Sequence, residues 1–188
     1  MALVDELIEA NDRFAVGFDA GDLPSPPRRR VVVLTCMDSR LHPEDFLGFG
    51  MGDAHVIRNA GGRASPDAIR SLVISSRELG TRRLVVIHHT DCGMLTLTNE
   101  DLRTTLREDA GVDATDIDFL PFSDLEGSVR EDVETIVSSP LLASGLEVSG
   151  FVYDVETGRI RQVVDTVATA GPPSDGASPT SDTDLTDG

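Results

Sequence analysis

Residues 31–40 have the sequence Val-Val-Val-Leu-Thr-Cys-Met-Asp-Ser-Arg, and this stretch decides the fold. Its first half is an unbroken, largely β-branched run, which is typical of a parallel strand covered on both faces. A similar run, Leu-Val-Val-Ile-His, occupies residues 84–88, and a shorter one occupies residues 55–58. Each run is followed by a segment of helical character. The sequence therefore predicts an α/β fold with a central, mostly parallel sheet flanked by helices.

The segments outside these runs predict helices and one hairpin. Two further strands, 148–155 and 159–164, flank Glu156-Thr157-Gly158, which is typical of a hairpin turn and would add an antiparallel edge to the sheet. The helices expected from apolar spacing or end signals cover residues 3–20, 43–49, 65–79, 93–109 and 129–137.

The chain divides into one domain and a tail. Residues 1–170 carry all of the expected helices and strands, so we expect a single α/β domain there. Residues 171–188 consist mainly of Gly, Pro, Ser, Thr and Asp, with almost nothing apolar. Such a segment buries too little surface to offset its ordering entropy, so we expect an acidic, disordered tail.

Two polar clusters follow buried strands and carry the candidate chemistry. Residues 36–40, Cys-Met-Asp-Ser-Arg, come directly after the first run, and residues 88–93, His-His-Thr-Asp-Cys-Gly, end the third. Sites in open α/β sheets form outside the carboxyl ends of the strands. Two thiolates and one imidazole, from Cys36, His89 and Cys92, suit zinc and leave a fourth position open, as catalytic sites require. The alternatives are cysteines that simply pack in the core, or a redox pair of Cys36 and Cys92.

Asp38 and Arg40 strengthen the catalytic interpretation. The carboxylate lies two residues beyond Cys36, and the guanidinium lies two residues further on. Arg40 can hold the Asp38 carboxylate through a forked contact, and Asp38 can then accept a hydrogen bond from solvent on the metal or bind the metal itself. A polar surface turn is the alternative interpretation of the same residues.

The order and spacing of three motifs resemble the β-carbonic anhydrases. They are Cys36-Met37-Asp38-Ser39-Arg40, then Arg58-Asn59-Ala60-Gly61, then His89-Thr90-Asp91-Cys92-Gly93, within a resemblance that covers residues 3–165. The resemblance implies one Zn²⁺ per chain bound by Cys36, His89 and Cys92. It also implies that Asp38 and Arg40 orient or regulate the zinc-bound solvent, and it leaves open whether Asp38 is a fourth ligand in a resting state. The implied reaction is the reversible hydration of carbon dioxide to bicarbonate and a proton by a zinc-bound hydroxide, in a homodimer or higher homo-oligomer.

Substrate and position 88 leave alternatives open. Proteins similar to this family hydrolyse carbon disulfide or carbonyl sulfide, and a non-catalytic protein that binds zinc or bicarbonate would keep the same fold. Asp38 and Arg40 argue against the non-catalytic alternative, because a purely structural site does not need them. The family often has Gly before the zinc histidine. We expect His88, as the last strand residue, to point away from His89, and a residue of its size to reshape the pocket wall or to add a proton shuttle.

The charge balance argues against some classes of partner. Sixteen basic residues, all arginine, face 33 acidic residues, which gives a net charge of -17. Such a charge repels nucleic acid and anionic membranes, so we expect neither as a partner. A carboxylate-rich, lysine-free surface is typical of adaptation to high salt, although an ordinary acidic protein from an arginine-rich genome would share it. The acidic first residues lack the pattern of a secretory signal, so we expect a cytoplasmic protein.

Overall fold

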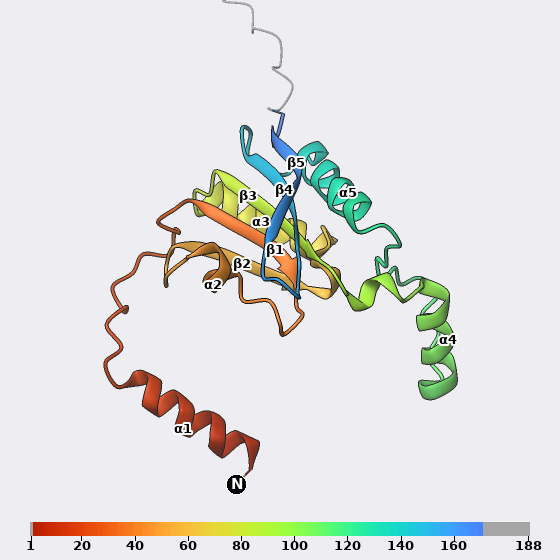
Figure 1. The fold of residues 1–188 in the computed structure, drawn as a ribbon, viewed down its shortest axis with the longest axis horizontal. Coiled ribbons are helices and arrows are strands. Elements are labelled where there is room, and N and C mark those ends of the chain that lie inside the picture. The colour runs from red at the N-terminus through yellow and green to blue at the C-terminus, as the bar shows by residue number, and fades with distance from the viewer. Residues whose placement is uncertain (1, 171–188) are drawn as a thin grey trace, which may run out of the picture.

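The computed structural model describes residues 2–170, which are built around a five-stranded sheet (Figure 1). The strand order is β2-β1-β3-β4-β5; β1 to β4 pair in parallel, and β5 runs antiparallel to β4. This arrangement confirms the predicted fold class, including the antiparallel edge. The strands are β1 (Val31–Cys36), β2 (Ala54–Asn59), β3 (Arg83–His89), β4 (Glu147–Tyr153) and β5 (Ile160–Ala168).

Within residues 2–170, five α-helices precede or connect the strands. Helices α3 and α5 cover one face of the sheet, where Leu72 of α3 and Val133 of α5 join the same apolar cluster as Leu34 of β1. The other face packs Val33 of β1 against α2, which contributes Phe46. The helices are α1 (Leu3–Ala15), α2 (Pro43–Leu47), α3 (Pro66–Val73), α4 (Asn99–Ala110) and α5 (Leu125–Ser138).

Side chains alternate along β3, and this alternation separates two neighbouring histidines. Leu84 and Val86 face the cluster beneath α3 and α5, whereas Ile87 faces the α2 side. Because the period of a strand is two residues, His88 continues the first set and His89 continues the second. The two rings therefore leave the same strand toward opposite faces of the sheet.

The largest differences from the predicted helix boundaries concern the helices expected over residues 3–20, 93–109 and 129–137. The first helix ends at Ala15 rather than at residue 20, and Gly17 follows with a φ of 87°. The single helix predicted over 93–109 is a short 3-10 turn followed by α4, because Thr98 starts a new helix. Its Oγ1 accepts from the Asp101 amide at 3.1 Å, and the Asp101 carboxylate accepts from the Thr98 amide at 3.2 Å. Helix α5 begins at Leu125, before the predicted residue 129.

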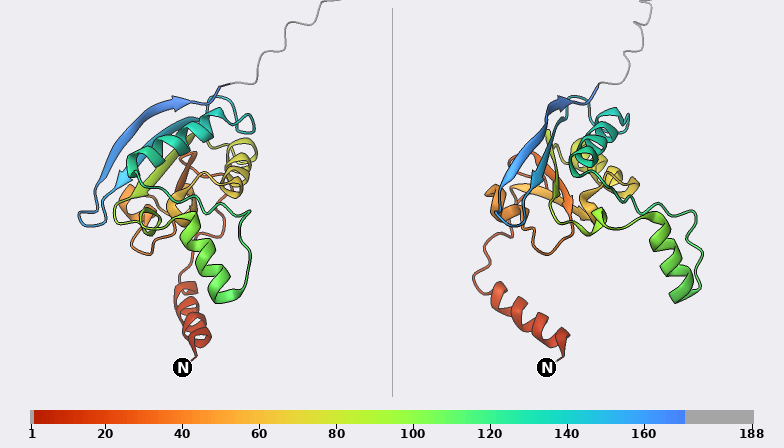
Figure 2. Two further views of the ribbon diagram at one scale, coloured as in Figure 1. Left: turned by 90° about the vertical axis from the view of Figure 1, so that its right-hand side faces the viewer. Right: turned by 45° about the vertical axis from the view of Figure 1, so that its right-hand side comes forward.

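Helices α1 and α4 project away from the sheet (Figure 2). Neither helix contains a buried residue. Helix α1 nevertheless carries large apolar side chains, with Leu7 60% exposed and Phe14 57% exposed. Contacts within residues 2–170 therefore leave the apolar side chains of α1 uncovered.

Two expectations concern the ends of the chain and membranes. The tail expected to be disordered, residues 171–188, lies outside the described residues. The single domain expected over residues 1–170 stays a prediction. Across residues 2–170, no helix has both the length and the apolar character needed to cross a membrane.

Candidate metal centre

The carboxyl ends of two adjacent strands bring the predicted metal ligands together. Cys36 ends β1 and His89 ends β3, and the two strands pair in parallel. Cys92 follows a tight turn in which Asp91 takes a positive φ of 54°, a conformation that Asp tolerates better than most residues. The turn directs the Cys92 side chain back over the strand ends.

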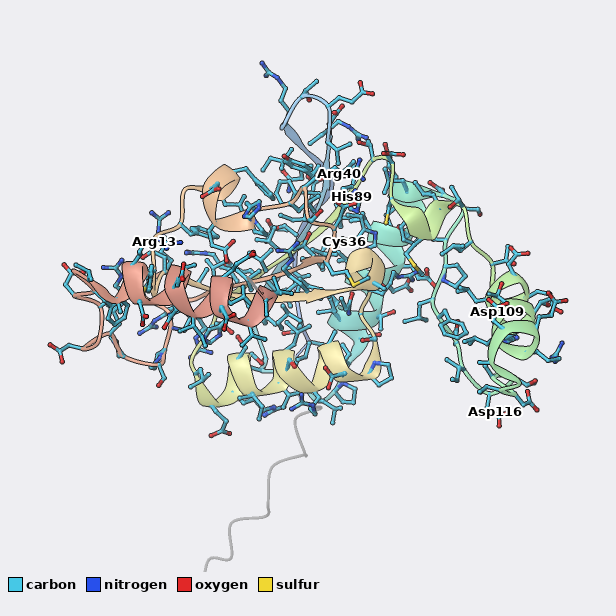
Figure 3. The ribbon with its side chains drawn as sticks, turned by 90° about the horizontal axis from the view of Figure 1, so that it is seen from below. Arg13, Cys36, Arg40, His89, Asp109 and Asp116 are labelled. Atoms are coloured by element: carbon cyan, nitrogen blue, oxygen red, sulfur yellow. The ribbon has the colours of Figure 1, made fainter. Side chains whose placement is uncertain are left out.

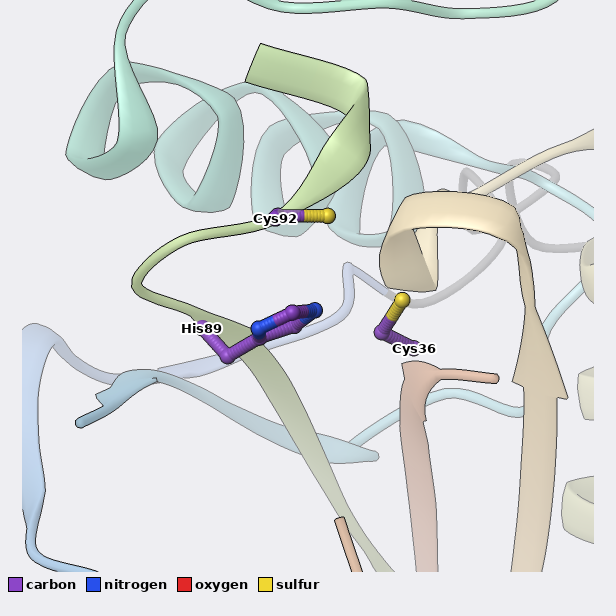
Figure 4. A group of neighbouring side chains, drawn as sticks. All are labelled: Cys36, His89 and Cys92. Atoms are coloured by element: carbon purple, nitrogen blue, oxygen red, sulfur yellow. The ribbon is translucent and has the colours of Figure 1, made fainter. Parts of the chain in front are cut away.

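The three side chains converge on one point (Figure 4). Their candidate ligand atoms, two Sγ and one imidazole nitrogen, all lie within 4.8 Å of one another. Cys36 and Cys92 are each 4% exposed, and His89 is fully buried. Both cysteines are free thiols. The arrangement can hold a metal ion.

His89 supplies the clearest test of that fit. Its Nδ1 lies 2.8 Å from the Thr90 carbonyl oxygen, which fixes the orientation of the ring. Its Nε2 is buried and has no hydrogen-bond partner. A buried polar atom without a partner is costly, and a metal ion held with the two sulfurs would satisfy it. The donor set therefore fits a metal such as zinc.

The surroundings of Cys36 favour its thiolate form. The pKa of Cys36 is lowered to about 4, chiefly by the neighbouring Cys92 thiol, with help from His89 and from the backbone at Asp38 and Gly61. The same pairing raises the pKa of Cys92. One negative charge is thus already stabilised at this site, as a cation would require.

Asp38 and Arg40 form a fixed pair beside the cysteines. Arg40 Nε donates to Asp38 Oδ1 at 2.9 Å, and Nη2 donates to Oδ2 at 2.7 Å, which is a forked contact. This guanidinium keeps the pKa of Asp38 well below its ordinary value. Arg40 Nη1 also donates to Asp91 Oδ2 at 2.7 Å. Asp38 Oδ2 lies 3.9 Å from His89 Nε2, so the carboxylate borders the candidate metal centre. Its partner Arg40 is labelled together with His89 and Cys36 in Figure 3.

A small, mostly apolar cavity opens onto these residues. Its volume is about 220 Å³. It touches both cysteines and Asp38, and the rest of its wall is aliphatic, thioether or glycine. The lining residues are Cys36, Met37, Asp38, Ala60, Gly61, Cys92, Gly93, Met94 and Leu97. The cavity suits a small substrate with little polar surface.

Known proteins with the same fold and sequence pattern identify the family. The family model for carbonic anhydrase matches residues 31–118. Beta-carbonic anhydrase 1 of Mycobacterium tuberculosis is 40% identical over 165 residues, covering 87% of this chain and 99% of that protein. The crystal structure of a carbonic anhydrase from Streptococcus mutans superposes with a TM-score of 0.83 at 51% identity, covering 87% of this chain and 98% of that chain.

The chain belongs to the β-carbonic anhydrase family. This membership confirms the resemblance seen in the sequence, and it confirms the predicted enzyme class, a lyase. Some relatives carry another name. Carbon disulfide hydrolase of an Acidianus species is 35% identical over 161 residues, covering 73% of this chain and 78% of that protein.

In this β-carbonic anhydrase, His88 points to the predicted face of the sheet but does not line the cavity. Strand β3 extends one residue further, to His89, and His88 points to the opposite face as predicted. The cavity wall does not include His88, so its side chain forms no part of the pocket wall. Its side chain is fully buried, which also argues against a proton shuttle to solvent. Its size is instead accommodated beneath α5.

Arg58 and Asn59 contribute contacts that the predicted site omitted. Arg58 Nε donates to the Cys36 carbonyl at 3.1 Å, and its Nη2 donates to the Asp38 carbonyl at 2.7 Å. Asn59 accepts the amide of Arg63 through Oδ1 and donates to the carbonyl of the same residue through Nδ2, both at 2.8 Å. The Arg-Asn-Ala-Gly motif was the available signal. It indicated the family, but not which backbone groups its side chains hold.

Proposed function

We propose that this protein catalyses the reversible hydration of carbon dioxide to bicarbonate and a proton, with one zinc ion per chain held by Cys36, His89 and Cys92. One observation carries the proposal: two buried sulfurs and an unpartnered imidazole nitrogen meet at one point beside a small apolar cavity. The family supports it, because its named relatives include β-carbonic anhydrases.

The chemistry of the donor set supports zinc over harder ions. Thiolate and imidazole ligands select zinc, whereas magnesium and calcium require oxygen. Three protein ligands leave one coordination position free, which is the mark of a catalytic site. When bound, zinc would lower the pKa of a coordinated water to roughly 7 and so supply a nucleophile near neutral pH.

Asp38 and Arg40 orient the reacting groups in this proposal. Asp38 stays ionised beside Arg40 and can accept a hydrogen bond from a protic group held at the three donors. Both oxygens of Asp38 accept from Arg40, which supports an orienting role over metal ligation. Arg40 is itself held by Asp91, so its fork cannot swing freely. The apolar cavity wall would hold carbon dioxide without offering it a competing hydrogen bond.

Carbon disulfide is the second candidate substrate, because carbon disulfide hydrolases are among the similar proteins. The two substrates share a linear shape and low polarity, so the cavity accepts either. The deciding experiment measures initial rates with both substrates on zinc-loaded full-length protein and on the same preparation after chelation.

Three outcomes of that experiment separate the candidates. Rapid carbon dioxide hydration that disappears on chelation and returns with zinc supports the proposal. Carbon disulfide hydrolysis without carbon dioxide hydration would replace it with the second candidate. Full zinc occupancy with neither activity would favour a non-catalytic zinc or bicarbonate-binding protein.

We also propose that the protein is a homodimer adapted to high salt. The uncovered apolar side chains of α1 support a second copy as their cover. A charge of -17 on each copy makes two copies repel, and dissolved salt screens that repulsion. Sedimentation across a salt series tests both parts. We expect a dimer that forms more completely as salt rises, and a monomer at every salt concentration would contradict it.

A further inference from the structure

His88 sits at the centre of a buried polar cluster that the proposed reaction does not use. Its Nδ1 lies 2.7 Å from Ser128 Oγ on α5. Its Nε2 lies 3.1 Å from Asp132 Oδ2, one turn further along the same helix, and 3.3 Å from the carbonyl oxygen of Gly62. The ring also stacks on Phe122, with centroids 5.4 Å apart. Both ring nitrogens therefore have partners, and one of those partners is backbone.

Arg63 closes the cluster from the other side. It is 4% exposed, and its Nε donates to Asp132 Oδ2 at 2.9 Å. Its Nη2 donates to Glu131 at 2.7 Å, and its Nη1 donates to the carbonyl of Leu120 at 3.0 Å. A buried ion pair with this many contacts holds its partners in one geometry. The loss of one member leaves the other charge buried without a partner, which strongly destabilises the fold.

The cluster fixes a glycine turn from behind. Gly61 and Gly62 precede Arg63 and have φ values of 79° and 73°, which favour glycine. A Cβ at Gly62 would lie 2.9 Å from the backbone nitrogen of Cys36, so the turn lies directly against the metal-site strand. Gly61 and Cys36 also line the same cavity. The turn thus has Cys36 on one side and His88 on the other.

We propose that Arg63, His88, Ser128 and Asp132 form a buried brace that positions the Gly61-Gly62 turn against Cys36 at the end of β1, which makes His88 a positioning residue for the metal centre. The expected change in kcat rests on the proposed function. The expected change in the geometry of the glycine turn does not. The brace acts through backbone. It contacts neither the cavity nor the three candidate ligands with its side chains.

The chain supplies a matched control for the brace. His55 Nδ1 lies 2.8 Å from Ser75 Oγ, and Ser75 is 3% exposed, like Ser128. This second pair involves β2 near its start, whereas Cys36 pairs with Asn59 at the end of β2. Ser75→Ala therefore removes the same kind of buried hydroxyl as Ser128→Ala, but far from the candidate metal centre.

The test compares four variants of the full chain: His88→Leu, His88→Gln, Ser128→Ala and Ser75→Ala. Cobalt(II), loaded into metal-free protein, is the probe. Its affinity and its thiolate charge-transfer absorption report on the Cys36 contact without any turnover. Hydrogen exchange at the Gly62 amide is measured on metal-free protein, and kcat and KM for carbon dioxide are measured on zinc-loaded protein.

We expect the two brace variants, His88→Leu and Ser128→Ala, to weaken cobalt binding or lower kcat by about 10–100-fold, the range typical of groups that orient metal ligands. They should also alter the charge-transfer absorption and speed exchange at Gly62, with little change in KM. His88→Gln, which can still donate near the position of Nε2, should recover much of the loss. Ser75→Ala should lower the melting temperature and leave the cobalt spectrum unchanged.

The proposal is overturned if His88→Leu folds with a wild-type cobalt spectrum and wild-type exchange at Gly62, or if Ser75→Ala changes both as much as Ser128→Ala does. If His88→Leu fails to fold, the comparison of Ser128→Ala with Ser75→Ala decides. Failure of the proposed function has a different signature. Wild-type protein would then lack carbon dioxide hydration while the cobalt and exchange differences remain.

Discussion

Two regions bury their side chains to opposite extents: helix α1, and the metal edge of the sheet, where β1 and β3 end at Cys36 and His89 beside Cys92. At the metal edge, Cys36, His89 and Cys92 are at most 4% exposed and converge within one chain. On α1, no residue is buried, and Leu7 remains 60% exposed. The difference shows that the candidate site is assembled by contacts within the chain, whereas contacts within residues 2–170 bury no residue of α1. An isolated helix of this length is marginal in water, which supports the proposal that a second copy covers α1.

The largest expected effect comes from removing a ligand at the metal edge. Cys92→Ser should lose zinc and bring carbon dioxide hydration to the uncatalysed rate, because an alcohol is a poor zinc ligand beside one thiolate and one imidazole. Metal analysis and stopped-flow rates on the same sample measure both. Circular dichroism serves as the control for folding. A variant that keeps full zinc and full activity would remove Cys92 from the site.

The next effect tests whether Asp38 orients the reacting groups rather than binding the metal. Asp38→Asn should keep zinc and lose about 10²–10⁴-fold in hydration rate, the usual contribution of such groups. Arg40→Ala should also lower the hydration rate, since Asp38 then loses its forked contact. Arg40→Lys should recover only part of that rate, because a point charge cannot copy two donors. Wild-type rates in zinc-replete Asp38→Asn would contradict the role given to this carboxylate.

The sequence predicted that Cys36, His89 and Cys92 would converge, because its signals are local. An unbroken run such as Val31–Thr35 indicates a buried strand, and the strand ends then bring Cys36 and His89 together. The role of His88 depends on residues far away in the sequence. Asp132 lies on helix α5, and no local pattern shows that it reaches the ring of His88 on β3.

Helix boundaries were harder to predict for a related reason. Apolar spacing continues through residues 93–109, but the reciprocal capping contacts of Thr98 and Asp101 start a new helix at Asn99. The apolar spacing of α1 predicted a helix, yet the same pattern says nothing about which surface covers it. A pattern within one segment indicates an element, and its partners depend on the rest of the fold.

A smaller effect tests the α1 side of the comparison. Leu7→Ser should weaken the proposed dimer, because a leucine buried against a second copy contributes about 1.5–3 kcal/mol, or roughly tenfold in Kd for each 1.4 kcal/mol. Leu141→Ser is the matched control, since Leu141 is 58% exposed and lies outside α1. Sedimentation equilibrium in high salt compares the two. Equal dimer affinity in both variants would mean that α1 does not lie at the interface.

The smallest effect is expected from the tail. Truncation before Gly171 should leave hydration rate and melting temperature unchanged, because the composition of residues 171–188 offers no apolar anchor. Differential scanning calorimetry and the same rate assay compare the truncated and full chains. A large loss of stability or activity on truncation would mean that the tail docks on the domain.

X-ray absorption at the zinc K-edge on the purified full chain tests the central claim most directly. It counts the sulfur and light-atom neighbours of the metal without assuming any activity. We expect one zinc per chain with two sulfurs at about 2.3 Å and two nitrogen or oxygen neighbours at about 2.0–2.1 Å. Cys36→Ser should reduce the sulfur count if any metal remains. A shell with no sulfur, or with four sulfurs, would contradict a site made by Cys36, His89 and Cys92 with one open position.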